Sequence, residues 1–155
     1  MPGHLGDARR YLTQDEWSLD LFSSSAYVML WDWDENSVDN RLWMFEEGEP
    51  RQFWISATLV DDNPTAGETQ ETRYLAVYVD RKVAGVDVVA FPAMGGDNHR
   101  WMLRDASDRL YHIVSKSSGM MCLDIRDAAT GNGAALVQQP CDATRASQKW
   151  SLQTK

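Results

Sequence analysis

The segment SQKWSL, residues Ser147–Leu152, decides the fold, because two earlier segments of the chain look like it. They are NRLWMF (Asn40–Phe45) and NHRWML (Asn98–Leu103). The three tryptophans follow one another at intervals of roughly 50–60 residues, which indicates one supersecondary unit copied until the copies bury a common core. Three copies in 155 residues fit a closed three-fold barrel, whereas a propeller needs at least about four blades of roughly 40–45 residues each.

The similarity between the copies extends upstream of each tryptophan, and the last copy is the fullest. It contains CLDI (Cys122–Ile125), a turn between Gly131 and Gly133, and a second apolar stretch, ALVQQPC (Ala135–Cys141). Elsewhere the chain also consists of short apolar runs, rich in β-branched and aromatic residues and separated by turn residues, which predicts an all-β fold. We expect Asp61–Glu68 to be a loop inserted in the second copy.

These segments resemble the ricin-B-type lectins, whose repeats carry Cys-Leu-Asp-Val, then Val-Gln-Leu-Trp-x-Cys, then Asn-Gln-x-Trp. The resemblance runs from about Tyr11 to Gln153 and is strongest in the last copy. It implies a single β-trefoil domain over residues 1–155, with pseudo-symmetric repeats at approximately 9–48, 49–105 and 106–155. It also implies a lectin that binds glycans, commonly through galactose or N-acetylgalactosamine.

Composition and charge narrow the range of partners. The chain is 43% hydrophobic and carries a net charge of −8 with only 15 basic residues, so we expect no nucleic-acid partner. No apolar run reaches the length of about 18 residues that a transmembrane segment needs. The start of the chain lacks the apolar core of a signal peptide, which leaves a cytoplasmic location open beside the extracellular one that the resemblance implies.

Enzyme, cofactor and metal motifs do not stand out. The sequence has no phosphate-cradling glycine loop, no nucleophile elbow and no paired-histidine helix. We therefore expect a protein that is not an enzyme, with no cofactor and no metal. The repeated Trp43, Trp101 and Trp150 are predicted to lie in the core, because tryptophan buries a large area; the alternative is that they form sugar platforms.

A sugar site needs a carboxylate that accepts hydroxyl hydrogen bonds, an aromatic face for the C–H side of the ring, and an amide donor. Hydrogen bonds to charged groups contribute about 1.5–3 kcal/mol against about 1 kcal/mol for neutral ones, so the carboxylate matters most. On the resemblance, the first copy supplies Asp20, Trp31 and Asn40, and we predict the best site there. Arg41 follows where the family has glutamine, and its planar donors suit an acidic sugar or a sulfate.

The other copies each lack an element of this trio. The second copy keeps an aromatic residue and an amide but has no carboxylate at the matching place, and the third keeps a carboxylate and an amide but has no aromatic residue. Their predicted residues are Phe91 and Asn98 in the second copy, and Asp124, Gln139 and Gln148 in the third. The acids of the first and third copies have an alternative role, which is to tie down loops.

Cys122 and Cys141 are the only cysteines. The resemblance implies that they form a disulfide, and closing a loop of this length stabilises a fold by about 3 kcal/mol in the chain-entropy model. A pair of buried thiols in a reducing compartment is the alternative.

Two other functions stay open beside the lectin. One is a protein-interaction trefoil that has lost sugar binding, such as a toxin-associated subunit or a protease-inhibitor-like protein with a partner protein. The other is a targeting module of a larger toxin or enzyme. Sugar titration distinguishes the first of these from a lectin.

Overall fold

The computed structural model describes residues 8–14, 17–21, 28–32, 41–63, 67–92, 96–118 and 121–153. The strands are β1 (Ala8–Gln14), β2 (Trp17–Leu21), β3 (Val28–Asp32), β4 (Leu42–Glu47), β5 (Gln52–Asn63), β6 (Gly67–Val77), β7 (Val88–Phe91), β8 (Trp101–Asp105), β9 (Leu110–Ser115), β10 (Met121–Ile125), β11 (Leu136–Pro140) and β12 (Trp150–Gln153). The 3-10 turns are η2 (Tyr78–Asp80), η3 (Asp97–His99), η4 (Arg126–Ala128) and η5 (Ala146–Gln148). No α-helix occurs in these ranges, which confirms the all-β prediction. Accordingly, none of the described residues forms a helix that is long and apolar enough to cross a membrane.

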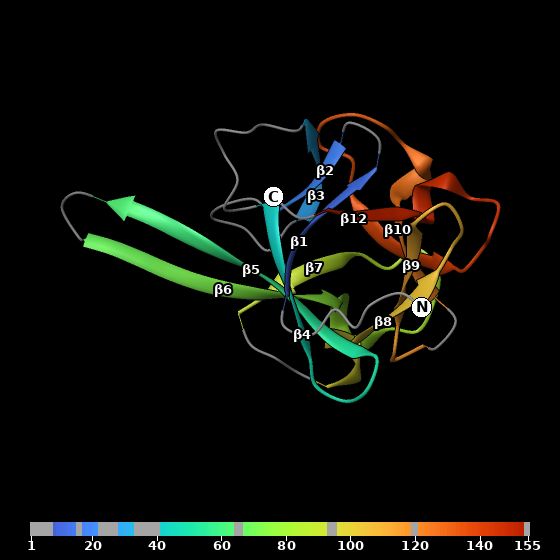
Figure 1. Cartoon of the computed structure of the whole chain (residues 1–155), viewed down its shortest axis with the longest axis horizontal. Helices are drawn as coiled ribbons and strands as arrows, with labels where there is room; N and C mark the ends of the chain where they lie inside the picture. The colour runs from blue at the N-terminus through green and yellow to red at the C-terminus, as the bar shows by residue number, and fades with distance from the viewer. Residues whose placement is uncertain are drawn as a thin grey trace.

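The strands form a barrel with hairpins attached to it. β1 pairs with β4 and β12, β5 pairs with β4 and β8, and β9 pairs with β8 and β12, so the ring closes on itself. The hairpins β2–β3, β6–β7 and β10–β11 are linked by backbone bonds, such as Leu30 N–H to the Ala134 carbonyl and Gln138 N–H to the Val86 carbonyl. This arrangement is the predicted β-trefoil (Figure 1). We call β1–β4, β5–β8 and β9–β12 the first, second and third repeats.

The tryptophan of each repeat lies in the core, as predicted. All three are 0% exposed. Each indole N–H donates to a leucine carbonyl of its own repeat: Trp43 to Leu19 at 2.9 Å, Trp101 to Leu75 at 3.0 Å and Trp150 to Leu123 at 3.2 Å. Burial of a large apolar ring together with a satisfied N–H explains why the repeat carries tryptophan at this place.

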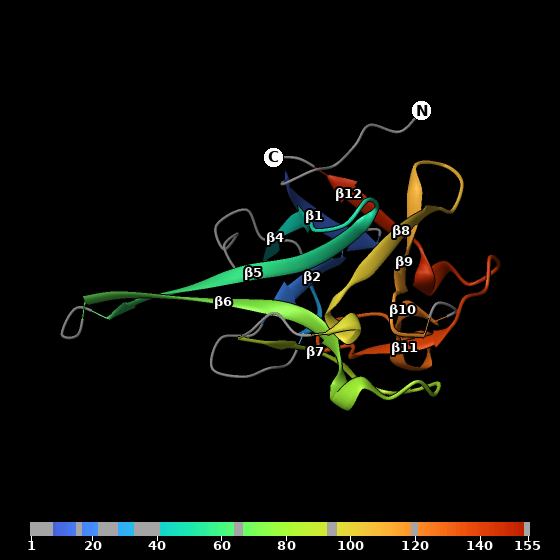
Figure 2. The same ribbon diagram turned by 90° about the horizontal axis from the view of Figure 1, so that it is seen from below.

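The second repeat differs from the others by a long two-stranded arm. Strands β5 and β6 pair from Ser56 with Tyr74 out to Asn63 with Gly67. The arm projects from the barrel in both views (Figures 1 and 2). The predicted loop at Asp61–Glu68 is therefore too long, since β5 continues to Asn63 and β6 begins at Gly67. The prediction failed because aspartate and asparagine favour turns, and here strand pairing overrides that local preference.

Candidate functional site

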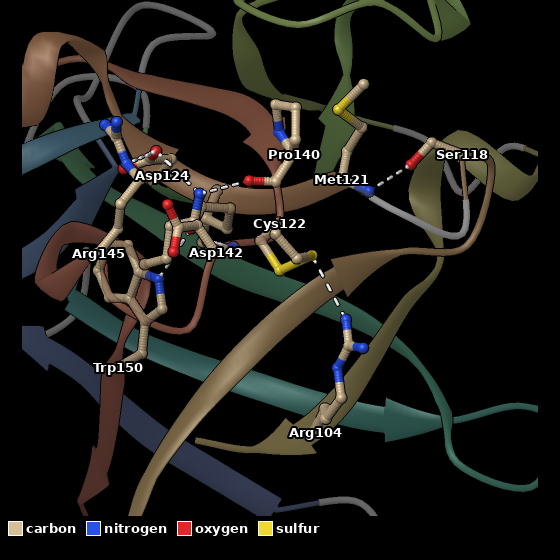
Figure 3. The surroundings of a disulfide bond; sticks show 12 residues. Arg104, Ser118, Met121, Cys122, Asp124, Pro140, Asp142, Arg145 and Trp150 are labelled. Carbon is tan, nitrogen blue, oxygen red and sulfur yellow. Dashed lines mark hydrogen bonds and ion pairs between the residues drawn. A yellow bond between two sulfur atoms is a disulfide. The ribbon is translucent and has the colours of Figure 1, made fainter. Parts of the chain in front are cut away.

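Cys122 and Cys141 form the predicted disulfide, with their Cα atoms 5.0 Å apart (Figure 3). The bond connects the start of β10 to the residue that follows β11. The Arg104 guanidinium donates to Cys141 Sγ at 3.4 Å. The cross-link therefore holds the two ends of the third-repeat hairpin together.

Asp20, the predicted carboxylate of the first repeat, lies inside the protein beside Arg41. Arg41 Nη2 is 3.0 Å from Asp20 Oδ2, and the two side chains are 5% and 3% exposed respectively. Burial raises the pKa of Asp20 to about 6, and the positive charge of Arg41 opposes this rise. The carboxylate is therefore internal and already engaged by a charged partner. The ion pair fits the alternative in which Asp20 holds the fold together.

Asp124 and Gln148 form the corresponding arrangement in the third repeat. Asp124 is 0% exposed, and Gln148 Nε2 donates to its Oδ2 at 3.1 Å and to the Pro140 carbonyl at 3.0 Å. The Asp142 N–H donates to Gln148 Oε1 at 2.8 Å, and Arg145 Nε lies 3.1 Å from Asp124 Oδ2 (Figure 3). These contacts tie the segment between β11 and β12 to β10. They occupy the polar atoms that a sugar would have to use.

The three-fold relation explains why these predicted site residues are internal. Asp20 and Asp124 each directly follow the leucine whose carbonyl accepts the buried indole bond. In the second repeat this place holds Ala76, and His99 stands where the others have Arg41 and Gln148. Ala76 and His99 are buried as well. All three repeats therefore use these positions inside the fold.

The remaining first-repeat residues are only partly described. Trp31 on β3 is partly exposed, and Ser18 Oγ donates to its carbonyl at 3.2 Å. Asn40 lies outside the described residues. The structure therefore brings Asp20 and Arg41 together in the interior, and the first-repeat trio stays a prediction.

In the second repeat the predicted residues lie on one partly exposed surface with an additional aromatic residue. The rings of Tyr78 and Phe91 stack with their centroids 6.3 Å apart and an interplanar angle of 24°. Asn98 Nδ2 donates to the carbonyl of Val77, the residue before Tyr78, at 3.1 Å. Tyr78 is 48% exposed, and Phe91 and Asn98 are partly exposed. We call Tyr78, Phe91 and Asn98 the aromatic platform.

Backbone strain lies directly beside this platform. Val79, the residue after Tyr78, has φ of 55° and is 66% exposed. A left-handed conformation is unfavourable for a β-branched residue, and such strain costs on the order of 1–3 kcal/mol. Asp127, at the matching place in η4 of the third repeat, has φ of 57°. The left-handed conformation is therefore a feature of this turn in the fold and does not depend on valine. The second repeat therefore keeps an apolar, exposed residue where an acid is easier to accommodate.

Sequence reasoning missed Tyr78. The run Tyr74–Val79 reads as one apolar strand, but β6 ends at Val77 and the turn places Tyr78 at the surface. The predicted Gln139 of the third repeat is partly exposed.

The other titratable groups point to no metal centre in the described part of the chain. No group of three or more histidine, cysteine or acidic residues is close enough there to hold a metal ion. His112, which is 6% exposed, has its pKa lowered by burial and by the nearby Arg104 and Lys149. This environment favours a neutral histidine with a structural role.

Comparison with known proteins agrees with the fold. Residues 67–139 match the family model described as "Ricin-type beta-trefoil lectin domain-like". This match and the trefoil architecture confirm the resemblance to the ricin-B-type lectins. No curated protein matches the chain.

Several solved structures share this architecture. A designed three-fold symmetric protein, ThreeFoil, is 24% identical with a TM-score of 0.77, covering 95% of this chain and 99% of that chain. The ricin B-like lectin of Macrolepiota procera, solved in complex with lactose, is 13% identical with a TM-score of 0.72, covering 99% of both chains. The exo-beta-1,3-galactanase 1,3Gal43A from Clostridium thermocellum is 24% identical with a TM-score of 0.72, and the match covers 96% of this chain but 31% of that enzyme. These likenesses, all below 25% identity, show the β-trefoil fold.

Proposed function

We propose that this protein is a carbohydrate-binding lectin for galactose-type sugars and that the aromatic platform of the second repeat makes the main contact. The observation that carries the proposal is the stacked pair of Tyr78 and Phe91, with Tyr78 48% exposed beside Asn98. An exposed aromatic face packs against the apolar C–H side of a sugar ring. The lactose complex of the similar Macrolepiota procera lectin supports the galactose class.

The polar groups around the platform supply hydrogen bonds for hydroxyls. Asn98 donates one amide hydrogen to the Val77 carbonyl, and an amide carries two such donors. A single shallow site of this kind binds weakly, near about 1 mM, which corresponds to roughly −4 kcal/mol. Avidity from a second site or from self-association would raise it.

The first repeat remains the competing location for the same function. Trp31 is partly exposed there, whereas the carboxylate of Asp20 is engaged with Arg41 in the interior. If the first repeat binds sugar, it does so through Trp31 with an acceptor other than Asp20. Comparing Trp31→Ala with Tyr78→Ala separates the two locations.

Titration of the ¹⁵N-labelled protein with lactose tests the proposal. We expect amide shifts at Tyr78, Phe91 and Asn98, and a loss of binding in Tyr78→Ala. Val83→Ala is the matched control, because Val83 is also an exposed apolar residue, at 56%. Undiminished binding in Tyr78→Ala together with loss in Trp31→Ala would move the site to the first repeat.

Protein interaction is the second candidate function, and one observation favours it. The exposed large apolar residues in the described part of the chain are Tyr78, Val79 and Val83, all in one short segment. Such a segment can also bury itself against a partner protein. No lactose binding at concentrations well above 1 mM, with the fold intact, would favour that function over the lectin.

A further inference from the structure

An open cleft lies between the first and third repeats. It has a volume of about 400 Å³. Thr13 of β1 and Leu30 of β3 line it from the first repeat, and Arg145, Lys149 and Ser151 line it from the third. A volume in this range accommodates a monosaccharide.

The charge of the cleft is opposite to that of the protein. Its lining residues include Arg145 and Lys149 and no aspartate or glutamate, although the chain has a net charge of −8. Arg145 approaches the buried Asp124 through Nε, at 3.1 Å, and its side chain is 39% exposed. A guanidinium carries five N–H donors in a planar fork, so the contact at Nε leaves donors at the other nitrogens. The cleft therefore presents cationic side chains on an otherwise acidic molecule, although the buried Asp124 compensates part of the charge of Arg145.

The remaining lining residues suit a sugar better than a simple inorganic anion. Leu110 and the exposed turn residue Ala128 supply apolar surface, and the core residue Leu30 lies at the floor of the cleft with 1% of its surface exposed. Hydroxyls of Thr13, Thr130 and Ser151 supply neutral donors and acceptors. We propose that this cleft is a second binding site, which takes a carboxylate-bearing sugar such as a hexuronate, with the carboxylate between Arg145 and Lys149.

The proposed acid-sugar site is independent of the aromatic platform. The lining residues of the cleft include none of Tyr78, Phe91 and Asn98. The sequence predicts that Arg41 favours an acidic sugar, but Arg41 is 4% exposed and ion-paired with Asp20. Arg145 and Lys149 carry the same chemistry at the cleft: Arg145 is 39% exposed, and Lys149 borders both this cleft and a neighbouring one lined by Arg104 and His112. Either site can therefore bind or fail to bind without the other.

Glucuronate titration of the ¹⁵N-labelled protein tests this site, with glucose, acetate and inorganic phosphate as comparison ligands. We expect glucuronate to shift the amides of Ala128, Ser147 and Lys149, and the other three ligands to bind more weakly. Lys149→Glu should lower the affinity for glucuronate by at least about tenfold, equivalent to roughly 1.4 kcal/mol. Lys82→Glu is the matched control, because it makes the same charge change at an exposed residue outside the cleft.

The outcomes separate the two proposed sites. Tyr78→Ala should keep glucuronate binding while it loses lactose binding, and Lys149→Glu should do the reverse. The acid-sugar site is ruled out if glucuronate gives no shifts in the cleft, or if glucose, acetate or phosphate binds as well as glucuronate. An equal loss in Lys149→Glu and Lys82→Glu would also overturn it, because the effect would then come from net charge alone.

Discussion

Replacement of Asp20 by alanine removes the carboxylate that lies next to Arg41 in the interior. The two groups are 3.0 Å apart and their side chains are 5% exposed or less. Removing one partner of a buried ion pair costs about 3–5 kcal/mol, because a buried charge loses its compensation. Since burial already raises the pKa of Asp20 to about 6, part of the cost of its charge is relieved by the change, and we expect the lower end, about 3 kcal/mol. Such a loss is a large share of the 5–15 kcal/mol that stabilises a typical domain.

Urea unfolding at pH 7.5, followed by tryptophan fluorescence, measures this loss. The control is the double variant Asp20→Ala/Arg41→Leu, which removes both charges and should be less destabilised than Asp20→Ala alone. Lactose binding by the folded fraction of Asp20→Ala should match that of the wild type. The reasoning is refuted if Asp20→Ala keeps its stability within about 0.5 kcal/mol but no longer binds lactose, since Asp20 would then act on the ligand rather than on the fold.

The folded-state pKa of Asp20, about 6, lies above its unfolded value of 3.8, so the stability from its protonated form is complete below about pH 4 and disappears as the pH rises through about 6. This contribution to the free energy of unfolding is at most roughly 3 kcal/mol. It is checked by measuring the free energy of unfolding of the wild type and of Asp20→Asn between pH 4 and 7. Parallel plots of stability against pH for the two proteins would contradict it. Reducing the Cys122–Cys141 disulfide, or replacing both cysteines by serine, should lower the free energy of unfolding by about 3 kcal/mol and keep the β-type circular dichroism spectrum; a complete loss of that spectrum would show that the core alone cannot hold the trefoil. Gln148→Ala should lower the free energy of unfolding by about 1–3 kcal/mol, because Asp124 and the Asp142 N–H each lose a hydrogen bond. Thermal unfolding at the same temperature in the variant and the wild type would count against this.

The fold could be predicted because the residue that recurs in each repeat, tryptophan, is also a residue of the core. The tryptophans recur at one place of each copy, and the structure gives all three the same bond to a leucine carbonyl. The arm could not be predicted, since Asp61 and Asp62 favour turns locally and only pairing of β5 with β6 makes them strand residues. Long-range pairing is what a local pattern does not contain.

The site could be predicted only in part, because exposure does not follow from residue type. Asp20 and Asp124 have the chemistry of sugar ligands, yet each follows a core leucine on a strand and is buried. Phe91 and Asn98 were found by position in the repeat, whereas Tyr78 was missed because it looks like the next residue of an apolar strand. A one-residue difference in where the strand ends decides whether that ring faces the core or the solvent.

Comparison among the three repeats separates structural from ligand-binding positions within this one chain. The two positions next to the core leucine and the tryptophan are buried in every repeat: they hold an acid ion-paired with arginine in the first, an acid bonded to glutamine in the third, and alanine and histidine in the second. These positions are all buried, so their variation preserves the interior. Tyr78 and Lys149 lie in segments that the barrel does not require to be aromatic or basic, and both segments are accessible to a ligand. Function in this trefoil is therefore best sought where the repeats differ at the surface, which places the aromatic platform and the basic cleft ahead of the three buried pairs.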